Sequence, residues 1–460
     1  MTAPTPAHAD KPNRLRRQLL AAPLLMSLTA PAGALDGAID ARNVALNAAL
    51  RALLDDPKQP LASLAVAVLR QGRLVHQAHF GRRTIDAHDA ALDLPVTADT
   101  LFRMASISKL VVALGVMRMV ESGRLDLDAD ISAMLGFELR HPRHPSAPIT
   151  LRLLLSHRAG LRDAGGAYLS TGQTVASRLL PGGAHYGDGA VWGAQAPGEF
   201  FEYCNLAYGV VASVMERASG ERFDRLMQRL VLRPLAMAGG FEASNFSAAE
   251  IAQLATLYRK SSDEIHWNSA GPWIAQTDAL HGRRPAPPAG IDDYVLGSNG
   301  SLFGPQGRLH TRLQDLARVA ALLLAEGRHH GEIFLKPASI RMLFSEQWRF
   351  DSVQGNGDSL DGMFQAWGLG VQHFIDRREP PGASHGDRLI EPGGQQAWGH
   401  LGFAYGLVAG LLVDPASGNG IVYVIGGTGA DPEVNPGRYS SFPIWEERLQ
   451  NLLWMHARAG

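Results

Sequence analysis

Segments with the pattern of paired β-strands lie near both ends of this 460-residue chain and constrain its fold most strongly. Leu61–Leu69 and Leu74–Phe80 are apolar or alternating and flank a Gln71-Gly72 turn. Gly406–Val413 and Gly420–Ile425 flank a second segment rich in turn residues. We therefore expect one sheet assembled from both ends of the chain, with the intervening residues inserted into it.

The intervening residues have mostly helical periodicity. Apolar residues recur at helical spacing from Ile107 to Val120, and Gly123 follows as a candidate C-cap. The predicted fold is α/β (α+β): an antiparallel β-sheet from both chain ends flanked by helices, an inserted helical subdomain, and an active site between them. We place the sheet parts at about 35–100 and 300–460, and the helical part at about 125–300. Further helices are predicted at Leu151–Ser156, Leu206–Ser219, Leu313–Glu326 and Trp445–His456.

The first 34 residues are typical of an export signal. A basic region from Lys11 to Arg17 precedes the short apolar run Leu19–Leu28, and Ala32-Gly33-Ala34 supplies small residues for cleavage. Arg16-Arg17 also resembles the start of a twin-arginine signal. The predicted mature chain, from residue 35 to 460, is exported to the periplasm and has no stable membrane span. A flexible cytosolic tail is the alternative interpretation.

The composition excludes some classes of partner. Charged residues make up 19% and the formal net charge is −1, so no basic field exists to attract nucleic acid or anionic lipid. The expected partner is a small-molecule or short-peptide substrate, and the oligomeric state stays open. The single Cys204 cannot form an intramolecular disulfide, and we expect it to be buried.

Ser106-Ile107-Ser108-Lys109 offers a nucleophile and a base on one helical face, because residues three apart are neighbours there. A serine hydroxyl needs a base within hydrogen-bond reach, and a buried lysine loses its preference for charge. The alternative is that Ser106 only caps the helix.

Tyr203-Cys204-Asn205 and His400-Leu401-Gly402 are two further candidate segments. Tyr203 and Asn205 stand at a loop-to-helix junction, where a phenol can relay protons and an amide can bind a carbonyl. Alternatively, Tyr203 packs in the core and Asn205 caps the next helix. His400 leads into a strand, or is simply a loop residue.

In this order, Ser-x-x-Lys, Tyr-x-Asn and His-x-Gly resemble the three motifs of the serine β-lactamase and D,D-peptidase superfamily. The similarity is closest to the branch with class C β-lactamases, family VIII esterases and D-alanyl-D-alanine carboxypeptidases. Blocks such as "TLFRMASISKL", "LRLLLSHRAGL" and "GRLHTRLQDLARVAALL" extend the resemblance over most of residues 61–427.

The resemblance implies a role for each motif residue. Ser106 would form the acyl-enzyme and Lys109 would help to deprotonate it, while Tyr203 would shuttle protons and Asn205 would orient the substrate. The remaining implied residues are His400 beside the cleft, Gly402 to keep the substrate's path clear, and the Phe403 N–H, which with that of Ser106 would form the oxyanion hole. No metal or cofactor is implied.

Two residues depart from the family's pattern. His400 replaces a permanent cation with a group expected to titrate near neutrality. Leu401 stands where penicillin-handling members commonly have Thr or Ser to bind a carboxylate, a contact worth about 1.5–3 kcal/mol. An uncharged ester or amide is therefore favoured, unless an arginine from a loop takes over. A D-alanyl-D-alanine carboxypeptidase or weak β-lactamase is the alternative, and a penicillin-binding sensor without turnover is another.

A second serine motif and two loops complete the predictions. Gly382–Gly386 matches the Gly-x-Ser-x-Gly pattern around Ser384, but lacks the strand and helix that such a nucleophile elbow requires. We expect a loop there. The loop-rich stretches 182–197 and 261–300 are expected to shape the substrate pocket.

Overall fold

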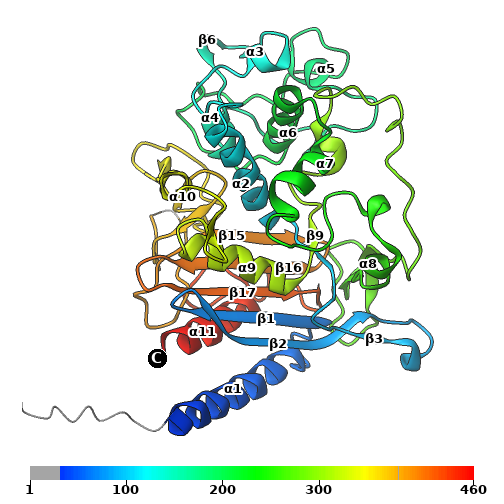
Figure 1. The fold of residues 1–460 in the computed structure, drawn as a ribbon, viewed down its shortest axis with the longest axis vertical. Helices are drawn as coiled ribbons and strands as arrows, with labels where there is room; N and C mark the ends of the chain where they lie inside the picture. Colours follow the sequence, from blue (N-terminus) through cyan, green and yellow to red (C-terminus); the bar gives the residue numbers. More distant parts are fainter. Residues whose placement is uncertain (1–31, 382, 460) are drawn as a thin grey trace, which may run out of the picture. The chain divides into compact units, whose positions relative to one another are not determined.

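Both predicted hairpins belong to one nine-stranded sheet, in a computed structural model that describes residues 32–381 and 383–459 (Figure 1). The strand order is β12-β13-β14-β15-β16-β17-β1-β2-β3, and every neighbouring pair is antiparallel. The strands are β1 (Ser63–Arg70), β2 (Arg73–Thr84), β3 (Leu94–Pro95), β12 (Trp348–Arg349), β13 (Ala366–Trp367), β14 (Gln372–Phe374), β15 (Ala397–Ala404), β16 (Leu407–Asp414) and β17 (Asn419–Ile425).

Strand β1 joins the two ends of the chain, because it pairs with β2 on one side and with β17 on the other. Alternate residues of β1 belong to different apolar clusters: Leu64 packs with residues of α11 (Ile444–Arg458), and Ala65 with residues of α2 (Ile107–Glu121) and α9 (Leu313–Leu324). Because both faces of β1 are buried, its sequence is a nearly continuous run of apolar residues. At the β1–β2 turn, Gln71 and Gly72 both have positive φ, as a two-residue hairpin requires.

The residues between β3 and β12 are mostly helices and loops. Besides α2 and α9, the α-helices of this segment are α3 (Ser132–Leu135), α4 (Leu151–Leu155), α5 (Val175–Leu179), α6 (Leu206–Ser219), α7 (Phe223–Met227), α8 (Ala248–Ala252) and α10 (Pro337–Leu343). Figure 1 shows α2, α4, α6 and α7 gathered beyond the β15 side of the sheet. The predicted fold class is therefore confirmed, with α6 at the predicted bounds and the other helices within a few residues of theirs.

The described residues start with α1 (Ala32–Leu54), which crosses the boundary between two units of the chain, residues 1–43 and 44–460. Residues 1–31 lie outside the described part, so the export signal predicted over 1–34 stays a prediction. None of the described helices has the length and hydropathy needed to cross a bilayer.

Candidate active site

Ser106 lies in a tight turn, Met104–Ser106, that we call the nucleophile turn. It connects β4 (Phe102–Arg103) to α2, and Met104 donates a backbone hydrogen bond to Leu309 (2.7 Å). Ala105 has φ of 42°, a left-handed conformation that is strained for a residue with a side chain and is found preferentially at functional sites. The Ser106 side chain makes no capping hydrogen bond, so its hydroxyl is not consumed by the start of α2.

Lys109 is fully buried, and its amine touches three oxygen atoms. Nζ lies 2.9 Å from Ser106 Oγ, 2.7 Å from Asn205 Oδ1 and 2.8 Å from the backbone oxygen of Gln306. The amide and backbone carbonyl oxygens can only accept hydrogen bonds. A neutral amine would therefore donate both of its N–H groups to them, and its lone pair would face the Ser106 hydroxyl.

Burial also sets the charge of this amine. It lowers the pKa of Lys109 to about 7, although the negative charge of Asp163 raises it in part. Near neutral pH, a large fraction of Lys109 is consequently uncharged. A neutral amine with its lone pair toward a serine hydroxyl is the arrangement that a general base requires.

Asp163 holds Asn205 in the orientation that Lys109 needs. Its carboxylate accepts hydrogen bonds from the Asn205 backbone N–H (2.9 Å), from Asn205 Nδ2 (2.7 Å) and from the Leu206 N–H (3.0 Å). Because Nδ2 must face this carboxylate, Oδ1 must face Lys109. Asn205 makes no side-chain cap of its own, so the alternative that it caps α6 is wrong; Asp163 supplies the acceptor there.

Tyr203 borders Ser106 and stays protonated. Burial raises the pKa of its phenol well above the ordinary value, although a hydrogen bond with Ser106 lowers it in part. Its ring lies 4.9 Å from Lys109 Nζ and 4.5 Å from the His157 ring, centroid to centroid. His157 Nδ1 in turn accepts the Cys204 N–H (3.1 Å), so this buried histidine fixes the backbone on which Tyr203 stands. Cys204 is buried, as predicted.

His400 does not titrate near neutrality as the sequence led us to expect. Burial, together with the nearby charge of Lys109, lowers its pKa to about 3. Nδ1 lies 2.6 Å from the Leu401 backbone oxygen, and the buried Nε2 has no hydrogen-bond partner among the described residues. Since a carbonyl oxygen only accepts, Nδ1 carries the proton and Nε2 presents a lone pair.

Gly402 lies against the nucleophile turn, and its predicted role in keeping the substrate's path clear stays a prediction. A Cβ on this residue would come within 2.6 Å of the Met104 backbone oxygen and 3.4 Å of Ala105 Cβ. Strand β15 therefore contacts the nucleophile turn through its backbone, and only glycine permits that approach. Phe403, the predicted second oxyanion donor, is the next residue along β15.

One pocket of about 500 Å³, within the usual size range of small-molecule sites, adjoins the site and has Phe403 in its wall. Its wall combines Ser106, Tyr203, Asn205 and His400 with aromatic and aliphatic side chains of Phe364, Trp367, Leu401 and Met363. The two loops that we expected to shape the substrate pocket, 182–197 and 261–300, are not part of this wall. The stretch 182–197 does not reach it, and residues 277–289 border an adjoining hollow instead.

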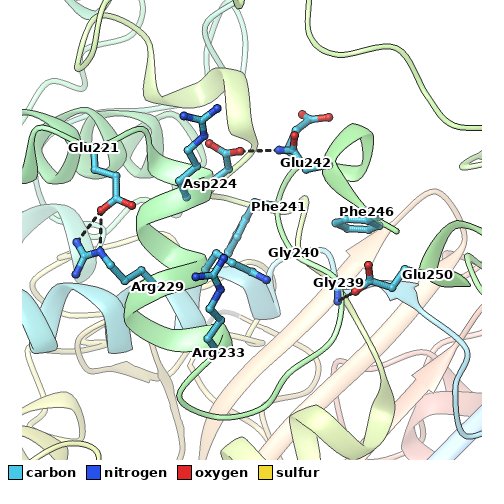
Figure 2. A pocket seen from close by; sticks show the side chains of 13 residues that line it. Glu221, Asp224, Arg229, Arg233, Gly239, Gly240, Phe241, Glu242, Phe246 and Glu250 are labelled. Carbon is cyan, nitrogen blue, oxygen red and sulfur yellow. Dashed lines mark hydrogen bonds and ion pairs between the residues drawn. The ribbon is translucent and has the colours of Figure 1, made fainter. Parts of the chain in front are cut away.

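A separate pocket of about 440 Å³ lies among residues 221–250 (Figure 2). Several of its polar groups are occupied: Arg229 pairs with Glu221 (2.7 Å), and Glu250 accepts the Gly239 N–H (3.0 Å). Its described lining holds no serine, threonine, cysteine, histidine or lysine, so it offers no hydroxyl, thiol, imidazole or amine nucleophile. Ala383–Gly386, the described remainder of the Gly-x-Ser-x-Gly segment, has neither helix nor strand, and Gly382 lies outside the described residues.

Comparison with known proteins identifies the family of this chain. The sequence model of the Beta-lactamase family matches residues 46–441, which is most of the chain. The chain belongs to the Beta-lactamase family. The resemblance predicted from the three motifs is thus confirmed.

Relatives within this family differ in what their names describe. "Esterase EstB" of Burkholderia gladioli is 30% identical over 49% of this chain and 57% of its own length. "Penicillin-binding protein 4" of Amycolatopsis lactamdurans is 24% identical over 70% of this chain and 71% of its own. The octameric penicillin-binding protein homologue from Pyrococcus abyssi shares the fold with a TM-score of 0.59, at 18% identity over 90% of this chain and 76% of that one.

Two residues of the site escaped the sequence analysis. Asp163 is the second residue after the "LRLLLSHRAGL" block and lies 43 residues before Leu206, the first residue of α6, so no local pattern links it to that helix. Gln306 contributes a backbone oxygen, which leaves no trace in the identity of a side chain.

Proposed function

We propose that this chain is a serine hydrolase that forms an acyl-enzyme at Ser106 and acts on an ester or amide. The observation that carries the proposal is the buried Lys109 amine, 2.9 Å from Ser106 Oγ, with two carbonyl oxygens positioned to take its N–H groups. Family membership supports the same class of enzyme.

The first proposed step is the acylation of Ser106. Neutral Lys109 takes the proton of the Ser106 hydroxyl while Oγ attacks the substrate carbonyl carbon, and the carbonyl oxygen becomes an oxyanion. Backbone N–H groups of Ser106 and Phe403 are proposed to stabilise that charge. The bond to the leaving group then breaks, which leaves an ester on Ser106.

Tyr203 serves as a proton donor and relay in this scheme. Because burial keeps its phenol protonated, it can pass a proton to the departing alcohol or amine and recover one from Lys109. Water then attacks the acyl group, with its proton leaving along the same route in reverse. Asn205 orients the substrate carbonyl and anchors the Lys109 amine.

Intact-mass spectrometry after treatment with a fluorophosphonate tests the nucleophile. We expect the wild-type chain to gain one label and Ser106→Ala to gain none. Ser384→Ala is the matched control, since Ser384 is exposed on a loop, and it should label like the wild type. Labelling of Ser106→Ala at the wild-type rate would overturn the assignment.

A D-alanyl-D-alanine carboxypeptidase or weak β-lactamase is the second candidate, favoured by the similarity to a penicillin-binding protein. Rates on a p-nitrophenyl ester, a chromogenic cephalosporin and a D-Ala-D-Ala peptide separate the two. Faster turnover of the peptide would favour the second candidate, and β-lactam labelling without turnover of any substrate would favour a sensor.

Export to the periplasm belongs to the same proposal, through a signal within residues 1–34. Expression of the full-length chain followed by mass analysis of the periplasmic fraction tests it. A mature form that starts near residue 35 is expected, and an uncleaved chain retained in the cytoplasm would contradict the prediction.

A further inference from the structure

The Ser106 pocket has an uneven distribution of charge. Among the described residues that line it, the charged side chains are Arg103 and Arg308, and neither an aspartate nor a glutamate faces it. A wall with cations and no carboxylate attracts anionic groups, provided that a cation is not already neutralised.

Arg103 is neutralised. Its guanidinium makes two hydrogen bonds to Asp278, from Nε (2.8 Å) and from Nη2 (2.6 Å), and the Arg103 side chain is only 15% exposed. His310 Nε2 lies 3.1 Å from the same carboxylate. Such a two-pronged pair satisfies both charges, so Arg103 has little capacity left for a ligand.

Arg308 is held in place and is only partly neutralised. Its stem packs across Gly304, where a Cβ would come within 2.4 Å of Arg308 Cβ, and Nη1 donates to the Leu302 backbone oxygen (3.0 Å). Its ion-pair partner is the buried carboxylate of Glu242, whose Oε2 lies 3.8 Å from Nη1, beyond hydrogen-bond distance. The side chain is 39% exposed, and within the described part of the chain its Nε and Nη2 make no hydrogen bond.

The chain places Arg308 close to the nucleophile. It follows Gln306, whose backbone oxygen contacts Lys109, and Gly307, which packs against the backbone of Ala105. A second hollow of about 570 Å³ adjoins the Ser106 pocket and shares Arg103, Arg308 and Tyr405 with it. Its lining also includes the carboxylates of Glu242 and Asp278, each of which forms an ion pair with one of these arginines. Arg308 therefore lies where the pocket that contains Ser106 meets the hollow bordered by residues 277–289.

We propose that Arg308 binds a carboxylate of the substrate, so that the preferred ester or amide is anionic and extends from Ser106 toward the second hollow. This inference rests on the proposed function and narrows its substrate class. The side chain of Leu401, in the wall of the same pocket, has no donor for a carboxylate, whereas a guanidinium offers two parallel N–H groups that match one. The carboxylate can belong to the acyl part or to the leaving group, and the test distinguishes them.

The test compares size-matched neutral and anionic esters. For the acyl part, p-nitrophenyl hemiglutarate is set against p-nitrophenyl valerate; for the leaving group, 3-(butyryloxy)benzoate is set against phenyl butyrate. The readout is the ratio of kcat/KM for the anionic ester to that for the neutral one. Arg308→Gln should lower this ratio about 10- to 100-fold for at least one pair, as expected for a lost hydrogen bond to a charged group.

Two further variants keep the result interpretable. Arg308→Lys retains the charge without the paired donors and should fall between wild type and Arg308→Gln. Arg225→Gln removes an exposed arginine that does not line the Ser106 pocket, and should leave both ratios unchanged. Thermal melts check that each variant is folded.

The outcomes separate the two proposals. An unchanged ratio for both ester pairs in folded Arg308→Gln overturns the Arg308 assignment, while labelling at Ser106 and turnover of the neutral esters would leave the proposed function standing. Failure to label Ser106 and to hydrolyse any ester would instead reject the proposed function itself.

Discussion

Protonation of Lys109 should switch off acylation as the pH falls below neutrality. The amine must be uncharged to accept the Ser106 proton, and burial lowers its pKa to about 7. About half of the enzyme is then active at pH 7, about one tenth at pH 6 and about one hundredth at pH 5. The difference from the ordinary value of 10.5 corresponds to about 5 kcal/mol of preference for the neutral form.

The assay is kcat/KM for p-nitrophenyl butyrate from pH 5 to 9, which reports ionisations of the free enzyme. We expect a slope of about one logarithmic unit per pH unit on the acid side and a plateau above pH 8. Lys109→Met should lower the plateau about 10²- to 10⁴-fold, the usual contribution of general base catalysis, and abolish the slope.

Titration of the other buried groups near Ser106 cannot produce this decrease of kcat/KM at acid pH. Burial lowers the pKa of His400 to about 3 and that of His157 well below the ordinary histidine value, whereas it raises the pKa of Tyr203. A flat profile between pH 5.5 and 8 in the wild type would refute the reasoning. So would an acid limb that persists in Lys109→Met.

Three further predictions concern stability and positioning. Because folding lowers the pKa of Lys109, the unfolded chain holds a proton that the native chain releases between pH 7 and 10.5. The free energy of unfolding of wild type should therefore rise relative to Lys109→Met with increasing pH, by about 2 kcal/mol from pH 7 to 9 in urea titrations; equal pH dependence would contradict a depressed pKa. Asp163→Asn places an amide opposite the Asn205 amide, so kcat should fall about 10- to 100-fold and Tm should drop, measured by ester kinetics and calorimetry. Unchanged kcat would remove Asp163 from the positioning of Asn205. Gly402→Ala sets a Cβ 2.6 Å from a backbone oxygen of the nucleophile turn and should reduce kcat at least about 10-fold, whereas Gly193→Ala, with no atom closer than 3.6 Å to its Cβ, should not. Equal activity of the two variants would show that β15 can move without cost.

Local sequence patterns predicted most of the secondary structure. The β1–β2 hairpin follows from apolar strands around Gln71-Gly72, and α6 from helical periodicity over Leu206–Ser219. The separation of Ser106 and Lys109 also follows from the sequence, because i and i+3 share a helix face at any position in a fold. The sequence could not distinguish a catalytic pair from a capping serine beside a surface lysine.

The long-range contacts favour the catalytic pair. Asp163 and Asn205 are distant in the chain, and so are Lys109 and Gln306, yet their hydrogen bonds orient the base. The predicted titration of His400 was wrong for the same reason: its pKa depends on the atoms packed around it, which no neighbouring residue specifies.

The sequence by itself therefore determined the sheet built from both chain ends, the helices between, and the spacing of Ser106 and Lys109. Only the tertiary structure decided the charge state of Lys109 and His400, the role of Asp163, and the position of Arg308 beside the nucleophile turn. The physical reason is that periodicity and spacing are local properties of the chain. Desolvation and hydrogen-bond partners arise only when distant segments pack together.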